Sequence, residues 1–194
     1  MPKLLQRLES RLESLPDGLQ AHIYRVRDVA LELAGRHAID LESAELGALA
    51  HDICRAVPNG DLLSMSAEFG MDVSEVEQDF PVLLHGPVGA ELLRREEDLT
   101  DSDLYEAVHW HSTAHATLAP LGKLIFLADK LDPQKITAYP FLPELRRMAL
   151  KDLDRAVLLF LSKETEAMAA KGWMIHPKVT ETRNHLLAVF NNEG

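Results

Sequence analysis

The chain has 194 residues, of which 46% are hydrophobic and 26% charged, a length that fits one domain with at most a short appendage. Its formal net charge of −11 argues against a basic surface for nucleic acid or anionic membranes. A small phosphate substrate remains open, because bound metal ions can reverse the local field.

The composition also indicates where the protein works. Cys54 is the only cysteine, so there is no internal disulfide framework and a reducing compartment suits the chain. The first residues, MPKLLQRLESRLESL, carry charges every few positions and so lack the apolar region of a signal peptide. The longest aliphatic run, AVLLFL, is far shorter than a membrane span. We therefore expect a cytoplasmic protein with neither a membrane nor a nucleic-acid partner.

The N-terminal third predicts helices. A short amphipathic helix over 4–14 is broken at Pro16-Asp17-Gly18. Residues 19–37 then repeat apolar side chains at steps of three and four, which is the helical period. Asp40 is a suitable N-cap for a further helix over 41–54, which would carry the dipeptide His51-Asp52.

Helices are also predicted in the rest of the chain. Pro58-Asn59-Gly60 breaks the chain before a helix that Gly70 ends, and a short segment near 74–79 follows. The spacing then predicts helices over 85–96 and 102–112, and a helix from Pro120 to Leu131 that Pro133 stops. Apolar positions recur over 143–170, and Pro177 opens a last helix. No alternating strand pattern appears, so the predicted fold class is all-α.

Histidines and aspartates are set into the apolar faces of these helices. His51-Asp52 lies in GALAHDICR, and Asp129 lies in KLIFLADKLDP, where a carboxylate is costly unless it is paired or binds a metal. Adjacent side chains on one helix diverge by about 100°. Asp52 could therefore approach the same metal as His51 from another side, or lie between two metals. The remaining members of the set are His22, His85 and His111.

Each histidine alone has an ordinary alternative role. His51 and Asp52 could form a hydrogen-bonded pair at a helix end, His22 could lie in a first turn, and His85 could simply begin its helix. His111 competes with His109 and His115, and positions 109 and 111 point to different faces, so at most one of them should face the site. His37 suits the end of its helix as a partner of the dipole and is left out. Imidazole and carboxylate groups together are what borderline divalent ions bind, which favours a metal site over the separate roles.

These motifs carry a family resemblance over His22 to Asn184, nearly the whole chain. The segments are HIYRVRDVALELA, ALAHDICR, LLHGPVGA, HWHST, LGKLIFLADKLDP and IHPKVTETRN. They resemble the HD-domain metal phosphohydrolases, and more narrowly the YqeK-type proteins, which are symmetrical bis(5'-nucleosyl)-tetraphosphatases. The resemblance implies a single helical bundle with the metal site in its core. It divides the chain into an N-terminal helical extension (1–17), an HD metal-binding core (18–134) and C-terminal helices packed on the core (135–194).

The resemblance further implies two divalent metal ions. His22, His51, Asp52 and Asp129 would bind the first ion, while His85 and His111 would bind the second, with Asp52 bridging. The family's metal is typically iron, and a site rich in histidine suits Fe, Mn, Zn, Ni or Co better than Mg. Asp52 and His51 would then belong to the catalytic centre of a hydrolase that attacks the central phosphate bridge with a metal-activated hydroxide, releasing two ADP from diadenosine tetraphosphate.

Basic side chains near these motifs are candidates for substrate phosphates. Arg25 and Lys123 match the family by local context and are counted with the catalytic residues, and Arg55 follows the HD pair. A solvated or ion-paired role is the alternative for each. His115 stands in Ser-Thr-Ala-His, where the family often has Thr-Gly-Arg, and QKITAYPF follows Asp132-Pro133 in place of Gly-Arg or Asn-Arg. Both departures bear on phosphate binding rather than on the metal ligands.

Two other functions stay open at this level. The same centre could hydrolyse another nucleotide, or the chain could be a sensing module that binds metal and nucleotide without turnover. The expected partner is in every case a small nucleotide. The oligomeric state is open, with a homodimer as one option through the first helix or the long helix near 145–169.

Overall fold

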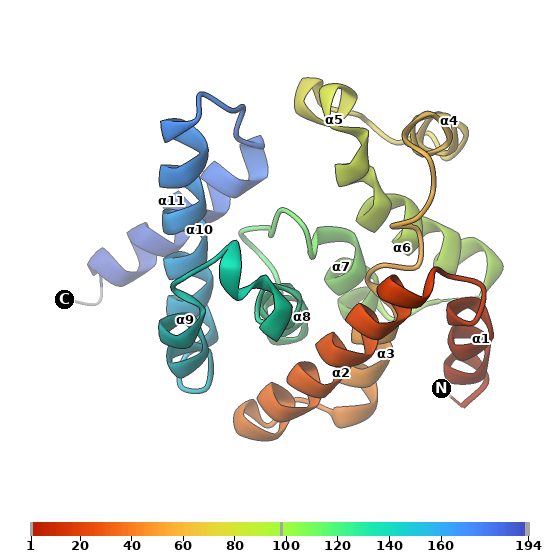
Figure 1. The fold of residues 1–194 in the computed structure, drawn as a ribbon, viewed down its shortest axis with the longest axis horizontal. Helices are drawn as coiled ribbons and strands as arrows, with labels where there is room; N and C mark the ends of the chain where they lie inside the picture. Colours follow the sequence, from red (N-terminus) through yellow and green to blue (C-terminus); the bar gives the residue numbers. More distant parts are fainter. Residues whose placement is uncertain (1, 98, 193–194) are drawn as a thin grey trace.

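The computed structural model describes residues 2–97 and 99–192, and this part of the chain is helical without a strand, as predicted (Figure 1). The α-helices are α1 (Pro2–Leu12), α2 (Asp17–His37), α3 (Leu41–Ala50), α4 (Asn59–Glu68), α5 (Glu75–Asp79), α6 (His85–Glu96), α7 (Ser102–Trp110), α8 (Pro120–Lys130), α9 (Leu142–Ala149), α10 (Leu153–Ala170) and α11 (Pro177–Asn192). Two short 3-10 helices, η1 (Pro81–Leu84) and η2 (Pro133–Thr137), were not predicted. None of the described helices is long and apolar enough to cross a membrane.

The central element is α8, which α2, α3, α7 and α10 surround (Figure 1). Its apolar segment from Leu124 to Ala128 is fully buried, so this helix faces the core on almost every side. Gly47 lets α3 approach closely, since a Cβ there would lie 2.9 Å from Cγ1 of Ile125. A polar group on α8 is therefore held in a desolvated and rigid setting.

Further helices flank this centre on opposite sides (Figure 1). On one side α6 packs on α7 and supports α4. On the other side α10 packs on α8 and carries α9 and α11. The N-terminal α1 covers α3, with Leu8 and Leu12 buried and Arg7 paired with Glu97 at 2.7 Å.

The prediction of one helix over 143–170 was wrong, because α9 ends at Ala149 and α10 begins at Leu153. The side chain of Asp152 accepts a hydrogen bond from the backbone N–H of Arg155 at 2.9 Å and so caps a new helix. Ala149 and Leu153 are both buried, four residues apart. The apolar period therefore continues across the break and hides it.

The helix predicted over 41–54 is also too long, because α3 ends at Ala50. Its predicted N-cap is confirmed, since Asp40 accepts from the N–H of Ser43 at 2.8 Å. His51 N–H still bonds to Gly47 O at 3.0 Å, but after it the backbone bonds join residues three apart, as in the 2.9 Å bond from Arg55 N–H to Asp52 O. His51 therefore caps α3, and Asp52 lies in the tight turn that follows.

The two flanks meet where α5 approaches the start of α11. Glu77 lies 3.6 Å from Nε2 of the buried His176, and it also closes a capping box with Ser74. Burial raises the pKa of Glu77, but His176 and the backbone N–H of Ser74 outweigh burial and hold it at about 2. This carboxylate therefore stabilises the junction only while it is ionised.

Replacing Glu77 with glutamine is expected to lower the melting temperature at pH 7 and to have little effect near pH 2. Its folded pKa of about 2 lies below the ordinary 4.5, so its contribution is complete above about pH 4.5 and is lost as the pH falls to about 2. We expect a cost of roughly 1–2 kcal/mol at pH 7. Thermal unfolding beside Glu75→Gln, an exposed residue of the same turn, measures it. Equal melting temperatures for the two variants at pH 7 would contradict the assignment.

Candidate metal centre

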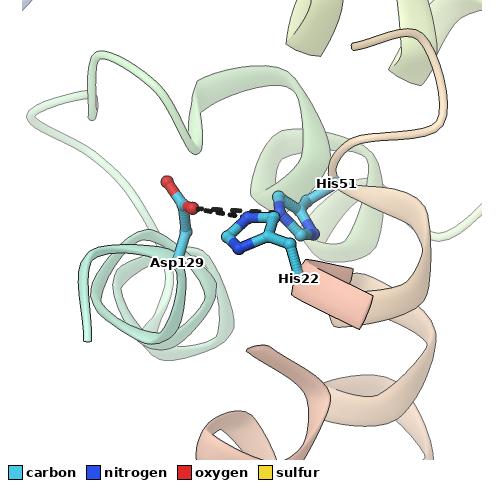
Figure 2. Close-up of side chains that lie close together, drawn as sticks. All are labelled: His22, His51 and Asp129. Carbon is cyan, nitrogen blue, oxygen red and sulfur yellow. Dashed lines mark ion pairs between the residues drawn. The ribbon is translucent and has the colours of Figure 1, made fainter. Parts of the chain in front are cut away.

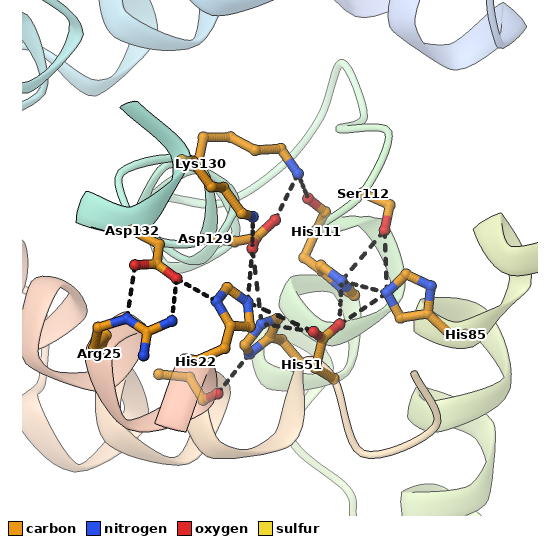
Figure 3. A network of polar contacts seen from close by, with 12 residues as sticks. His22, Arg25, His51, His85, His111, Ser112, Asp129, Lys130 and Asp132 are labelled. Carbon is orange, nitrogen blue, oxygen red and sulfur yellow. Dashed lines mark hydrogen bonds and ion pairs between the residues drawn. The ribbon is translucent and has the colours of Figure 1, made fainter. Parts of the chain in front are cut away.

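Six side chains from five segments of the chain converge at α8. Figure 3 labels His22, His51, His85, His111 and Asp129 among them. His22 comes from α2, and His51 with Asp52 comes from the turn after α3. His85 begins α6, His111 follows α7, and Asp129 stands near the end of α8. Five of the six are buried and His22 is nearly so. Residues spread over more than a hundred positions of sequence thus meet in one desolvated place.

The six residues form two groups, and within each group the ligand atoms lie within 4.8 Å of one another. The first group is His22, His51 and Asp129 (Figure 2), with Asp129 Oδ1 at 3.1 Å from His22 Nε2 and 4.0 Å from His51 Nε2. The second group is Asp52, His85 and His111. Both groups have the mixed nitrogen and oxygen donors that borderline divalent ions take.

Asp52 contacts both groups with different oxygens. Its Oδ1 lies 2.9 Å from His85 Nε2 and 3.4 Å from His111 Nε2. Its Oδ2 lies 3.6 Å from the Nε2 atoms of His22 and His51. A carboxylate in this position can donate one oxygen to each of two cations.

Hydrogen bonds orient the four imidazoles. Nδ1 of His51 donates to Ala48 O at 2.6 Å, and Nδ1 of His111 donates to Val108 O at 2.7 Å. His85 bonds in the same way to the carbonyl of Val82. Because a carbonyl oxygen only accepts, Nδ1 carries the proton in these three residues and Nε2 presents a lone pair to the site.

The residues around the Nε2 atoms do not provide enough hydrogen-bond donors for their lone pairs. His85 Nε2 and His111 Nε2 lie 2.9 Å apart, and the hydroxyl of Ser112, at 3.4 and 3.2 Å, can donate to only one of them. His51 Nε2 is buried without a hydrogen-bond partner among the described residues. Facing lone pairs repel unless a cation lies between them, so the donor set fits divalent metal ions.

The electrostatics keep His51, His111 and the two carboxylates in the state that binds a metal. Burial lowers the pKa of His51 and brings that of His111 to about 4, so both are neutral at pH 7. Burial also acts to raise the pKa of each carboxyl. For Asp129 the charge of Lys130 and the hydrogen bond with His22 outweigh burial, and for Asp52 His51 and His111 do so whenever they carry a proton toward it, so both pKa values lie well below the ordinary range. Neutral imidazoles and ionised carboxylates are the required ligand forms.

His22 is oriented by a carboxylate that the sequence analysis did not single out. Its Nδ1 donates to Asp132 Oδ2 at 2.6 Å, and Arg25 binds both oxygens of Asp132 at 2.8 Å (Figure 3). Burial acts to lower the pKa of His22, but hydrogen bonds to Asp129 and Asp132 outweigh it and raise the pKa. The only sequence hint was Asp132 before Pro133, where it also caps η2 by accepting from Gln134 N–H at 3.0 Å.

A cavity of about 820 Å³ opens beside the two groups. His22, Asp52, His85, His111 and Asp129 form one end of its lining. Its walls come from the segment through α5 and η1 on one side and from α10 and the start of α11 on the other. This volume lies within the range of small-molecule sites.

The four basic residues predicted for substrate phosphates are distributed unevenly. Arg55 lines the cavity, whereas Arg25, Lys123 and His115 do not. Lys123 pairs with Asp154 at 2.5 Å. His115 stacks on Trp110 with ring centroids 4.8 Å apart and bonds to Thr117.

Two lysines that the sequence analysis missed lie on the cavity instead. Lys130 Nζ contacts Asp129 Oδ2 at 2.7 Å and His111 O at 3.2 Å. Lys135 Nζ contacts Asp129 Oδ1 at 2.5 Å from η2. Their proximity in sequence to Asp129 was the available hint. In the fold these two lysines line the cavity, whereas Arg25 and Lys123 do not.

Comparisons with known proteins agree with this centre. The model of the HD domain matches residues 19–134. The chain is 28% identical over 91% of its length to the symmetrical bis(5'-nucleosyl)-tetraphosphatase of Bacillus subtilis, and covers 93% of that protein. It is 29% identical to the protein of that name from Halalkalibacterium halodurans, with 86% of this chain and 87% of that protein covered.

A solved structure is also similar. It is the crystal structure of a predicted HD superfamily hydrolase involved in NAD metabolism from Clostridium acetobutylicum, which is 26% identical with a TM-score of 0.88. The superposition covers 95% of this chain and 97% of the other. Because the HD model spans more than half of the chain, including His22, His51-Asp52 and Asp129, the protein belongs to the HD-domain family.

Proposed function

We propose that the protein hydrolyses dinucleoside tetraphosphates at the central phosphate bridge, so that diadenosine tetraphosphate yields two ADP. The observation that carries this proposal is Asp52, whose two oxygens face two separate ligand groups at the end of a cavity. Two metal ions about 4 Å apart are a common arrangement for phosphoryl hydrolysis. The curated relatives that bear this activity in their names support the choice of substrate.

The proposed cofactor is a pair of divalent ions, with iron first and Mn, Zn, Ni or Co as alternatives. His22, His51, Asp52 and Asp129 would hold the first ion, while Asp52, His85 and His111 would hold the second. Such a pair supplies Lewis-acid chemistry and a hydroxide nucleophile at neutral pH.

The chain's own residues bind and orient the substrate. Lys130, Lys135 and Arg55 line the cavity beside the ligand groups, where their charges would hold phosphate oxygens. The carboxylates of buried Asp52 and Asp129 stay ionised, and the contacts described above hold their orientation. Arg25, His51 and Asp132 act through the geometry of the centre rather than on the phosphates.

A second candidate keeps the centre and changes the substrate. The similar Clostridium acetobutylicum protein is described as involved in NAD metabolism, which favours another nucleotide bearing a phosphate bridge. Both candidates need the same metal ligands. They differ in the length of the phosphate chain that the cavity accepts.

Product analysis tests the proposal. The purified chain, supplied with iron or manganese, is incubated with diadenosine tetraphosphate in water enriched in oxygen-18. The nucleotides are then separated, and their molecular masses are measured by mass spectrometry. ADP as the only product, with the label in one of each two molecules, supports central cleavage. ATP with AMP would contradict the symmetrical reaction. An absence of turnover by metal-loaded protein would send the test to other nucleotides, including NAD, and then to binding without hydrolysis. Chelated protein serves as the control.

A further inference from the structure

The wall that α10 contributes to the cavity carries a carboxylate that the metal centre does not use. Glu164 lines the cavity together with Phe160, Leu161 and Met168. Their spacing of three and four residues puts them on one face of the helix. In the described part of the chain no side chain forms a hydrogen bond or ion pair with Glu164, although it is half-buried. A ligand bound in the cavity could therefore donate hydrogen bonds to this carboxylate.

Glu164 stands one helical turn after Phe160, whose ring centroid lies 5.9 Å from Nζ of Lys130. Burial raises the pKa of Glu164, with the charges of Lys130 and Lys171 acting against it. Burial also raises the pKa of Tyr139 to about 12, with contributions from both Glu164 and Asp129. Tyr139 and Lys130 therefore lie within electrostatic range of both Asp129 and Glu164.

The charge of Glu164 restricts what can bind beside it. A phosphate would be repelled by the carboxylate, so the adjacent part of a ligand must be neutral and must donate hydrogen bonds. Farther out, the rim turns apolar at Met168, Trp173 and Met174, and the last two are 57% and 41% exposed. Large exposed apolar side chains gathered at one cavity mouth are typical of a ligand contact.

The order along this wall is therefore cation, hydrogen-bond acceptor, apolar surface. Lys130 and Lys135 contact Asp129, Glu164 follows Phe160 by one turn on α10, and exposed Trp173 comes after the end of that helix; all of them line the cavity. Phe160 and Met168 on the same helix are separated by about 12 Å at 1.5 Å per residue. A nucleotide presents its groups in the same order, as phosphates, ribose hydroxyls and an aromatic base.

We propose that this wall is a nucleoside subsite in which Glu164 accepts hydrogen bonds from the ribose hydroxyls and Met168, Trp173 and Met174 contact the base. The assignment rests on the proposed function, because it takes a nucleotide as the ligand. Glu164 is then a specificity-determining residue, which separates nucleotides from inorganic polyphosphates of equal charge.

Calorimetric binding of ADP, 2'-deoxy-ADP and pyrophosphate to the manganese-loaded full chain tests the subsite. Glu164→Gln is expected to weaken ADP about tenfold, because a charged acceptor is lost. Pyrophosphate should bind the variant as tightly as the wild type, or more tightly, since a repulsive charge is removed. Wild-type protein should prefer ADP to 2'-deoxy-ADP about tenfold, and the variant should lose that preference. Glu166→Gln, at a side chain 78% exposed on the same helix, is the matched control and should behave as wild type.

Four results would overturn the subsite: an unchanged ADP affinity in Glu164→Gln, a parallel change for ADP and pyrophosphate, no wild-type preference for the ribose, or a lack of ADP binding to wild-type protein. Failure of the proposed function is separate from these outcomes. If the nucleoside-dependent binding is found but diadenosine tetraphosphate is not cleaved, the hydrolase proposal falls and the subsite stands.

Discussion

Replacing Asp52 with alanine is expected to abolish hydrolysis and to reduce the bound metal from two equivalents to fewer than one. The physical reason is that the carboxylate of Asp52 faces both ligand groups, with Oδ1 toward His85 and Oδ2 toward His22. Its removal takes away the single negative charge that the two metal positions share and leaves mainly neutral imidazoles around each cation. We expect turnover to fall at least about a thousandfold. Metal analysis after dialysis and ADP release measure the two effects.

His85→Ala provides the matched comparison. His85 belongs to the second group only, so this variant should lose about one metal equivalent and keep the first. Circular dichroism should show the helical content of both variants unchanged, which separates loss of metal from loss of fold. Full metal content in Asp52→Ala would exclude the bridging role. An unchanged metal count in His85→Ala would point to a single ion.

The sequence predicted the six converging residues well, because each has a local cue. Asp129 is a carboxylate in a buried apolar run. His51-Asp52 directly follows a helix whose buried residues are all apolar. Helical periodicity indicated that at most one of His109 and His111 faces the site, and the family resemblance selected His111; His109 lies away from the centre beside Tyr105 and Trp110. His22 and His85 were identified through the order of the motifs along the chain, which resembles that of the HD-domain family.

The partners of the ligands could not be predicted in the same way. Whether Arg25 reaches a phosphate or a carboxylate depends on how α2 packs against α8 and η2, and no local pattern encodes that packing. Lys123 faces Asp154 for the same reason, since α10 approaches α8 from a distant part of the sequence. Helix ends could not be predicted where buried apolar positions continue across a turn, as between Ala149 and Leu153.

Replacing Asp132 with asparagine is expected to weaken the first metal position about 10- to 100-fold and to leave the second unchanged. Asparagine keeps the shape of the side chain but loses the charge that His22 Nδ1 and Arg25 share at 2.6 and 2.8 Å. His22 then loses its fixed ring orientation and part of the basicity of Nε2. Titration of metal into the metal-free variant measures the affinity of each position. Asp152→Asn, which affects only the cap of α10, is the control.

Arg25→Gln decides how the arginine acts, because its two roles predict different results. If Arg25 holds Asp132, as its two bonds at 2.8 Å indicate, the variant should weaken the first metal position in the same direction as Asp132→Asn, with KM nearly unchanged at saturating metal. If Arg25 instead binds substrate phosphate, KM should rise while metal affinity stays as in the wild type. Arg27→Gln, on the same helix, should change neither quantity, because Arg27 contacts its neighbours Asp28 and Tyr24 and no residue of the centre among those described. A double variant of Arg25 and Asp132 that is no weaker than Asp132→Asn alone would show that both residues act on His22 as one unit.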